Sequence, residues 1–244
     1  MFETLSVFQL TASAAILALA YLVRGVAGFG SGLIAVPMLS LMLPLSLVVP
    51  LMVLLDYMAS LSHGLSNRSE IRWKEILPLI PFSILGVLIA LFFMSRSDAM
   101  LLTRALGVFV ILFALFTLSG YTPKSGAAKA WGIFAGFSGG LIGTLFGTGG
   151  PFYVTYFKAR GLHKAAFRTT LAVTFMLDGA GRLVGFTSSG YFNGENLKLL
   201  VMAFPIMAIF LYIGGHIHTK LTQKQFEQAI SVLLMVSGVV LLVK

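Results

Sequence analysis

Long apolar runs recur along the whole chain, and most are about as long as a membrane-spanning helix, which needs about 20 apolar residues. Charged residues make up only 10% of the 244 positions, against about 25% in a soluble domain. We therefore predict an all-α polytopic membrane protein with little mass outside the bilayer. The candidate segments, of which the second and seventh are short or interrupted, are 5–27, 28–45, 46–63, 76–94, 100–119, 130–147, 148–160, 165–188, 197–214 and 226–243. That leaves eight to ten membrane segments.

The first segment does not resemble a cleaved signal. Glu3 is its only early charge, and the apolar stretch runs on to Val23, so we expect a retained first helix. The formal charge of +9 comes from basic residues in short loops beside apolar spans, which indicates membrane orientation rather than a nucleic-acid partner. The chain has no cysteine, which excludes disulfides, thiolate-bound metals and iron–sulfur clusters. We expect no cofactor and no metal site.

The ten segments form two matching sets of five. Several residues recur at a constant offset, with a few residues inserted between the early and the later helices of the second set. This predicts two homologous repeats, residues 1–120 and 121–244, within a single transporter domain. An offset of 119 places Gly28 on Gly147 and Gly30 on Gly149; an offset of 124 places Pro81 on Pro205, Ala105 on Ala229 and Val108 on Val232.

The basic residues predict the orientation. If every segment crosses the membrane, twelve of the 17 Lys and Arg fall on one side, which is then cytoplasmic, and both termini are periplasmic. An odd number of crossings per repeat makes the repeats inverted, which we prefer; four crossings would make them parallel. The twelve are Arg24, Arg68, Arg72, Lys74, Lys124, Lys129, Lys158, Arg160, Lys164, Arg168, Lys220 and Lys224.

Two glycine runs occupy equivalent places in the repeats, Gly28-Phe29-Gly30-Ser31-Gly32 and Gly147-Thr148-Gly149-Gly150-Pro151. Glycine loosens a helix, and Pro151 suits the first turn of a new one. We predict that the helices break here, as half-helices or re-entrant segments. A half-helix offers unpaired N–H groups to an anion, and Thr148, Ser31 and Tyr153 add hydroxyls. For the glycines at 136–143, whose four-residue spacing is typical of tight helix contacts, we favour packing.

Ionisable residues inside apolar segments are candidates for function, because a charge at the centre of a spanning helix costs about 2.5–3.5 kcal/mol. Asp56 and Asp178 could carry a proton. Asp178 and Arg182 are four residues apart and could instead pair with each other. Arg24 could extend to the membrane interface or donate to an oxyanion beside Gly28. Arg104 lies near a helix end, and we expect a surface charge there.

The run Gly28-Phe29-Gly30-Ser31-Gly32-Leu33-Ile34-Ala35-Val36-Pro37 and its counterpart Gly147-Thr148-Gly149-Gly150-Pro151 resemble the paired signature of the TauE/SafE family of sulfite exporters. The resemblance extends over nearly the whole chain, although Ser31 stands where a further glycine is common. It implies a multi-pass transporter of small sulfur-containing anions such as sulfite, sulfoacetate and related organosulfonates, usually moved out of the cell.

We therefore expect an exporter of such an anion in the bacterial inner membrane, working by alternating access. Its partners would be the anion and the lipid bilayer, and the sequence leaves open whether two copies form a homodimer. The alternatives are a carrier for another small carboxylate or ion and an intramembrane lipid-modifying enzyme, for which we find no nucleophile or acid/base set. The predicted substrate-binding residues are Arg24, Gly28, Gly30, Ser31, Gly32, Gly147, Thr148, Gly149, Gly150, Pro151, Tyr153 and Arg182.

Overall fold

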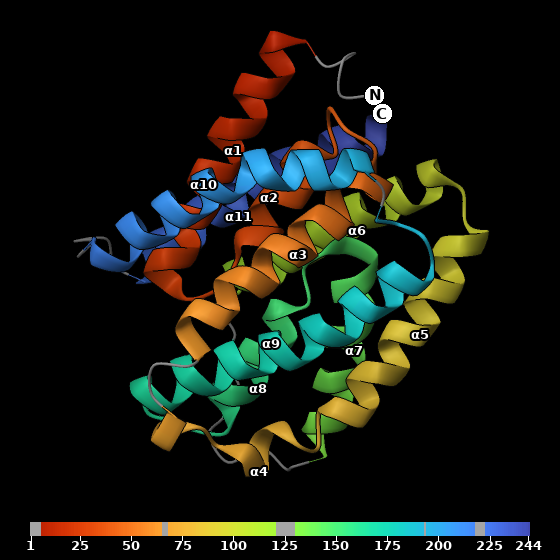
Figure 1. The fold of residues 1–244 in the computed structure, drawn as a ribbon. Helices are drawn as coiled ribbons and strands as arrows, with labels where there is room; N and C mark the ends of the chain where they lie inside the picture. The colour runs from red at the N-terminus through yellow and green to blue at the C-terminus, as the bar shows by residue number, and fades with distance from the viewer. Residues whose placement is uncertain (1–5, 65–67, 121–129, 193, 218–222) are drawn as a thin grey trace. The chain divides into compact units, whose positions relative to one another are not determined.

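The computed structural model describes residues 6–64, 68–120, 130–192, 194–217 and 223–244 (Figure 1). Over these residues the chain is helical and has no strand, which confirms the predicted all-α class. The elements are α1 (Val7–Ala27), α2 (Ser31–Leu39), α3 (Leu45–Gly64), the short 3-10 helix η2 (Arg68–Glu70), α4 (Trp73–Ile76), α5 (Ile80–Arg96), α6 (Ala99–Leu118), α7 (Trp131–Phe146), α8 (Gly150–Ala159), α9 (Lys164–Ser188), α10 (Gly194–His216) and α11 (Gln223–Val243).

The length and composition of the helices suit a membrane. Within the described ranges, three are long and apolar enough to span one: Val7–Ala27, Ala99–Leu118 and Leu197–His216. Shorter apolar helices cover Leu45–Leu61, Ile80–Arg96, Trp131–Phe146 and Gln228–Val243. Large apolar side chains are exposed along α5, α6, α10 and α11, where lipid rather than water is the favourable neighbour. Examples are Leu88, Leu112, Val201 and Val236.

The helices form two compact units, and each unit takes helices from both halves of the chain. Unit 1 comprises Met1–Leu51, Ser97–Tyr121 and Asn193–Lys244, and contains α1, α2, α6, α10 and α11. Unit 2 comprises Met52–Arg96 and Thr122–Phe192, and contains η2, α4, α5, α7, α8 and α9. Helix α3 begins in unit 1 and ends in unit 2. The repeat boundary after residue 120 stays a prediction, and position 121 lies outside the described residues.

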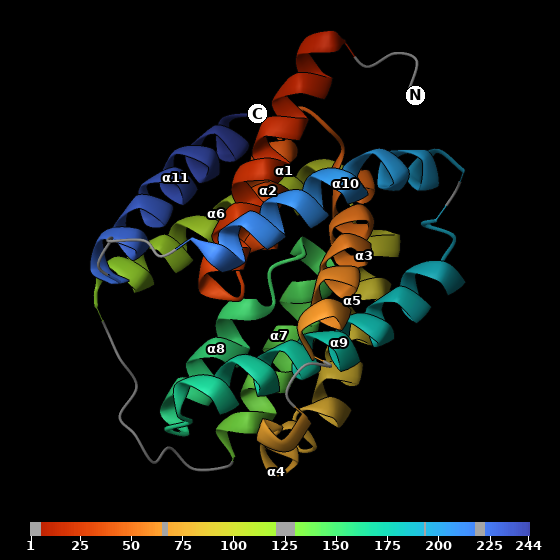
Figure 2. The ribbon, with the colours of Figure 1, turned by 60° about the vertical axis from the view of Figure 1, so that its left-hand side comes forward.

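In unit 1, glycines allow two pairs of helices to pack backbone against backbone (Figure 2). Helix α1 crosses α10 at Gly25 and Gly214, where a Cβ on Gly25 would lie only 2.6 Å from Leu211 O. Helix α11 lies beside α6, and a Cβ on Gly107 would lie 2.9 Å from Gly238 O. Close approach through small residues is the usual way for helices to associate in a bilayer.

In unit 2, α5 and α7 pack in the same way. A Cβ on Gly136 would lie 2.5 Å from Leu79 O, and one on Gly140 would overlap Ser83 O. From the other side, a Cβ on Gly86 would overlap Phe137 O. The packing role predicted for the glycines at 136–143 is therefore confirmed at Gly136 and Gly140. The other two glycines of that run face different neighbours.

Candidate functional site

Helix α1 stops at the first glycine run, in unit 1. It ends at Ala27, and the N–H of Gly28 donates to Arg24 O over 2.6 Å with φ of 84° at Gly28. Gly30 has φ of 100°, and α2 begins at the next residue. Glycine takes these left-handed conformations without the steric cost that a side chain adds. The two glycines therefore turn the chain between the helices.

Arg24 reaches across this turn. Its Nη1 donates to Ser31 Oγ over 2.9 Å, and both side chains are buried, with Arg24 7% exposed. The side chain therefore folds onto the turn, and donation from Arg24 to an oxyanion stays a prediction. The contact brings a guanidinium and a hydroxyl together at the first turn of α2, where Gly32 is also buried.

Helix α7 stops at the second glycine run, in unit 2. It ends at Phe146, and Gly147 has φ of 65°. Helix α8 begins at Gly150 with Pro151 in its first turn. Thr148 lies between the two helices, is 2% exposed, and its Oγ1 has no hydrogen-bond partner. A buried hydroxyl left unpaired costs about 1–3 kcal/mol, so this one requires an explanation.

A buried polar group lies beside this turn. Arg182 on α9 forms an ion pair with Asp178, and its Nη2 also donates to Gly139 O over 3.2 Å. Ser83 Oγ from α5 donates to Asp178 Oδ1, and Tyr153 OH lies 3.4 Å from Ser83 Oγ. The pairing of Asp178 with Arg182, one of the two predicted alternatives, is therefore observed.

The ion pair does not satisfy the whole guanidinium. Arg182 is 7% exposed, and its Nε has no hydrogen-bond partner. An unsatisfied buried N–H of a charged group is rarer and more costly than a neutral one. Thr148 Oγ1 at the α7–α8 turn and Arg182 Nε on α9 are thus two buried polar atoms of unit 2, both able to donate, without hydrogen-bond partners.

Glycines make room for the guanidinium. A Cβ on Gly143 would overlap it, and one on Gly149 would lie 2.7 Å from its Nη2. A Cβ on Gly139 would overlap the ring of Tyr153. These glycines border the polar group, whereas Gly136 and Gly140 pack on α5.

Sequence reasoning missed Ser83, Gly139 and Gly143 as members of the polar group. Gly139 and Gly143 could have been noticed because they are four residues apart and lie on a different face of the helix from Gly136 and Gly140. Ser83 could have been noticed only as a polar residue in an apolar segment. The predicted residues divide between the units, with those at the first run in unit 1 and those at the second in unit 2. Asp56 is half-buried on α3.

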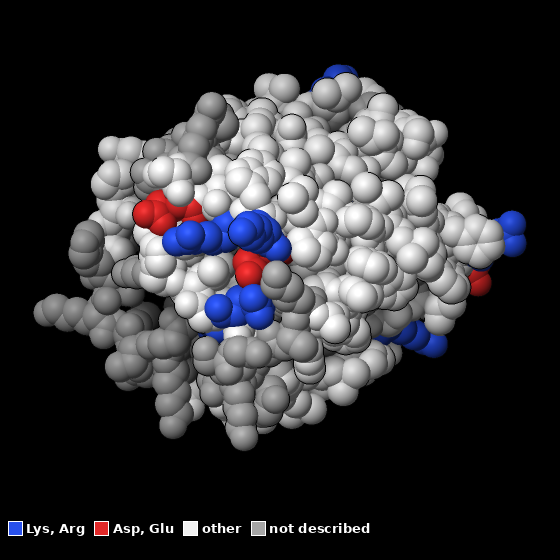
Figure 3. All heavy atoms as spheres, turned by 90° about the horizontal axis from the view of Figure 1, so that it is seen from below, with Lys and Arg blue, Asp and Glu red and all other residues white. Residues whose placement is uncertain are grey.

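A charged cluster fixes the other end of α8. Glu75 on α4 accepts from Arg160 Nε over 2.8 Å, from Arg160 Nη2 over 3.0 Å and from Tyr156 OH over 2.9 Å. Seen from the side on which α4 lies, blue and red side chains gather in a small area amid uncharged surface (Figure 3). The cluster holds α8 at its last turn.

A comparison with known protein families shows which family the chain belongs to. The model of the family described as Sulfite exporter TauE/SafE matches residues 13–241. The chain belongs to the TauE/SafE family. It is also similar to the "Probable inner membrane transporter protein TsaS" of Comamonas testosteroni, with 27% identity over 192 residues, or 77% of this chain and 80% of that protein. No solved structure matches it.

The family match confirms the resemblance seen in the two glycine runs. TauE/SafE proteins and the relative are transporters, and the apolar helices of this chain agree with a multi-pass membrane protein.

Proposed function

We propose that this TauE/SafE protein exports a small sulfur-containing anion, such as sulfite, sulfoacetate or a related organosulfonate, across the bacterial inner membrane by alternating access. One observation carries the proposal: Thr148 Oγ1 and Arg182 Nε are buried without hydrogen-bond partners beside the α7–α8 turn. An oxyanion is the ligand that would satisfy both donors. The family description, a sulfite exporter, supports the choice of substrate class. The name of the relative, a probable inner membrane transporter, supports the choice of membrane.

The anion would be held mainly by hydrogen bonds. Arg182 Nε and Thr148 Oγ1 would donate to its oxygens, and the N–H of Gly150, the first of α8, would do so at the positive end of the helix dipole. Hydrogen bonds to a charged group are worth about 1.5–3 kcal/mol each. In unit 1, Arg24, Ser31 and the turn at Gly28 and Gly30 would supply the equivalent groups in the other repeat.

Asp178 would act as the counterion of Arg182 in the empty carrier. An arginine with no partner in the apolar interior is costly, so the pair lets the unloaded protein change conformation without a bare charge. Adding a monoanion makes the site net negative. With the cell interior negative, moving that charge outward releases about 2.3 kcal/mol per 100 mV. Export would then need no coupled ion, although Asp178 and Asp56 remain the candidates for carrying a proton.

The packing of the glycine helices supports the repeat. Under the offsets given by the sequence, α1 corresponds to α7 and α5 to α10. Helix α1 packs along α10, and α7 packs along α5, so each contact is the repeat equivalent of the other. We propose that the repeats are inverted, with both termini periplasmic, as the distribution of basic residues predicts.

Replacement of Thr148 by Val tests the site. We expect Thr148→Val to weaken binding of sulfite or sulfoacetate about tenfold or more and to slow their flux in proteoliposomes, because about 1.5–3 kcal/mol of hydrogen bonding is lost and about 1.4 kcal/mol corresponds to a factor of ten. The melting temperature without anion should stay unchanged or rise, because the hydroxyl has no partner to lose and its unpaired burial is costly. Isothermal titration and radiolabelled flux give the two readouts.

Thr144→Val is the matched control. Thr144 is also buried on this side of the break, but its Oγ1 already donates to Gly140 O over 2.7 Å within α7. Its replacement should leave anion affinity unchanged. Equal affinities for Thr148→Val and the wild type would remove Thr148 from the site, and faster flux of small carboxylates than of sulfonates would refute the substrate class.

Asp178→Asn separates binding from turnover. The variant leaves Arg182 without its counterion, so we expect tighter anion binding by about three- to tenfold and slower exchange, because the empty carrier must now move a bare charge. Glu70→Gln, which removes a carboxylate of unit 2 that pairs with His163 at the surface, is the control and should alter neither measurement. Weaker anion binding by the Asp178→Asn variant would contradict this, because it would show that Asp178 helps to hold the anion. It would then not act only as the counterion of Arg182 in the empty carrier.

A further inference from the structure

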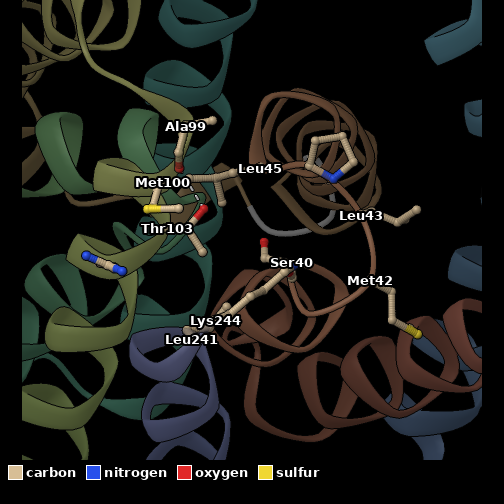
Figure 4. Close-up of a pocket in the computed structure, with 11 residues that line it drawn as sticks. Ser40, Met42, Leu43, Leu45, Ala99, Met100, Thr103, Leu241 and Lys244 are labelled. Carbon is tan, nitrogen blue, oxygen red and sulfur yellow. Dashed lines mark hydrogen bonds between the residues drawn. The ribbon is translucent and has the colours of Figure 1, made fainter.

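A second polar pocket lies in unit 1, at the end of α2 opposite to the Gly28–Gly30 turn. Its cavity of about 370 Å³ is lined by the α2–α3 connection, the first turns of α6 and the end of α11 (Figure 4). That volume is within the range of small-molecule sites, about 300–1,000 Å³. Helix α2 has nine residues and a rise of about 1.5 Å per residue, so this pocket is about 13 Å from Ser31.

One buried hydroxyl in the pocket has no partner. Ser40 is 2% exposed, and its Oγ forms no hydrogen bond. Figure 4 shows this hydroxyl directed toward the space between Thr103 and Leu45. The hydroxyl of Thr103 is already used, because it donates to Ala99 O over 2.8 Å. Since buried polar groups are nearly always paired, the free hydroxyl of Ser40 points to a ligand.

The charges around this hydroxyl are positive. Arg104 and Lys244 line the pocket, and all other lining residues are uncharged. Lys244 Nζ is held by Ser40 O and Leu41 O over 3.2 and 3.1 Å, and an ammonium has three hydrogens to donate. One therefore remains for a ligand.

The first turn of α6 adds to this positive potential. Ala99 and Met100 line the pocket, and Asp98, the residue before the helix, does not cap it with its side chain. The first N–H groups of a helix have no intrahelical acceptor and carry the positive end of its dipole. The α6 terminus and the unpaired Ser40 hydroxyl are independent features, and both favour an anion.

We infer that this pocket binds an oxyanion, a phosphate or sulfonate, joined to a short apolar stem. Arg104, Lys244, the Ser40 hydroxyl and the α6 terminus would hold the oxyanion. Leu45, Met100 and Leu241 would contact the stem. Two sources share this chemistry, the headgroup of an anionic phospholipid and a free organosulfonate. The inference does not rest on transport, because no residue of the pocket belongs to either glycine run.

Binding to the purified full-length protein tests the inference, with dihexanoyl phosphatidylglycerol and sulfoacetate as separate probes and dihexanoyl phosphatidylcholine as the zwitterionic comparison. We expect at least one anionic probe to bind tenfold or more weakly when Arg104→Gln and Lys244→Gln are combined. Ser40→Ala should weaken the same probe three- to tenfold without lowering the melting temperature. Lys198→Gln, which removes an exposed cation of unit 1 outside the pocket, is the matched control and should have no effect.

The two anionic probes distinguish a lipid headgroup from a soluble anion as the ligand of the pocket. A loss confined to phosphatidylglycerol assigns the pocket to a lipid headgroup, and a loss confined to sulfoacetate assigns it to a soluble anion. For sulfoacetate, binding that persists when Asp178→Asn is combined with Arg182→Gln, but is lost when Arg104→Gln and Lys244→Gln are added, belongs to this pocket, even if transport fails. Binding of both anionic probes unchanged in the double variant, or equal binding of phosphatidylcholine, would overturn the inference.

Discussion

Neutralising both members of the buried ion pair, Asp178→Asn with Arg182→Gln, is expected to lower sulfite or sulfoacetate affinity at least tenfold and to abolish flux, while the protein still folds. The single change Arg182→Ala would leave Asp178 buried without a partner, and breaking one side of a buried pair typically costs about 3–5 kcal/mol. The double variant avoids that penalty, because neither position keeps a charge. The two introduced amides are not ions, so the fold is retained while the charged donor to the anion is lost.

The measurements are anion titration and the melting temperature of the same preparation. Arg96→Gln is the matched control, because Arg96 lies at the end of α5 in the same unit, is exposed and stacks on the Phe92 ring at 4.2 Å. It should bind and transport as the wild type does. A double variant that is well folded and binds sulfoacetate with unchanged affinity would exclude Arg182 from the site.

The helix ends at the glycine runs could be predicted because their causes are local. A left-handed glycine such as Gly28 or Gly147 ends a helix whatever packs around it, and Pro151 suits the first turn of the next helix. The apolar runs likewise predicted most of the long helices to within about four residues, although α2 ends at Leu39, six residues before the predicted end. These properties depend on a few consecutive side chains, and the sequence contains all of them.

The contacts within the candidate site could not be predicted, because they join distant parts of the chain. Ser83 meets Asp178 only because α5 and α9 pack together in unit 2. The spacing of Asp178 and Arg182 allowed either a pair or a free arginine, and only the packed helices select the pair. Arg24 presented the same ambiguity, which the turn at Gly28 resolves by bringing Ser31 within reach.

The glycines of α7 show how one pattern contains two roles. Positions 136, 139, 140 and 143 all have the spacing of tight helix contacts, yet a helix has several faces. Gly136 and Gly140 face the backbone of α5, whereas Gly139 and Gly143 face Tyr153 and Arg182. The spacing predicts close approach, and only the neighbours show whether it serves stability or the site.

Alanine substitutions on these two faces of α7 should therefore affect different properties, transport on one face and stability on the other. We expect Gly143→Ala to lower anion flux at least tenfold, because its Cβ would displace the guanidinium of Arg182. Any loss of stability should come from the weakened ion pair with Asp178. Gly140→Ala should instead lower the free energy of unfolding by about 1–3 kcal/mol, the usual cost of overpacking, because its Cβ would overlap the backbone of Ser83.

Gly181→Ala is the control for the change of residue type. A Cβ on Gly181 meets nothing within 4 Å, and alanine favours a helix by up to about 1 kcal/mol over glycine. The variant should be as stable as the wild type or more so, and equally active. Flux in proteoliposomes and thermal unfolding in detergent distinguish the three proteins. If Gly143→Ala transports as fast as Gly181→Ala, transport does not require the guanidinium of Arg182 to lie against α7. The position of Arg182 beside the Gly147–Gly149 turn would then not explain anion binding.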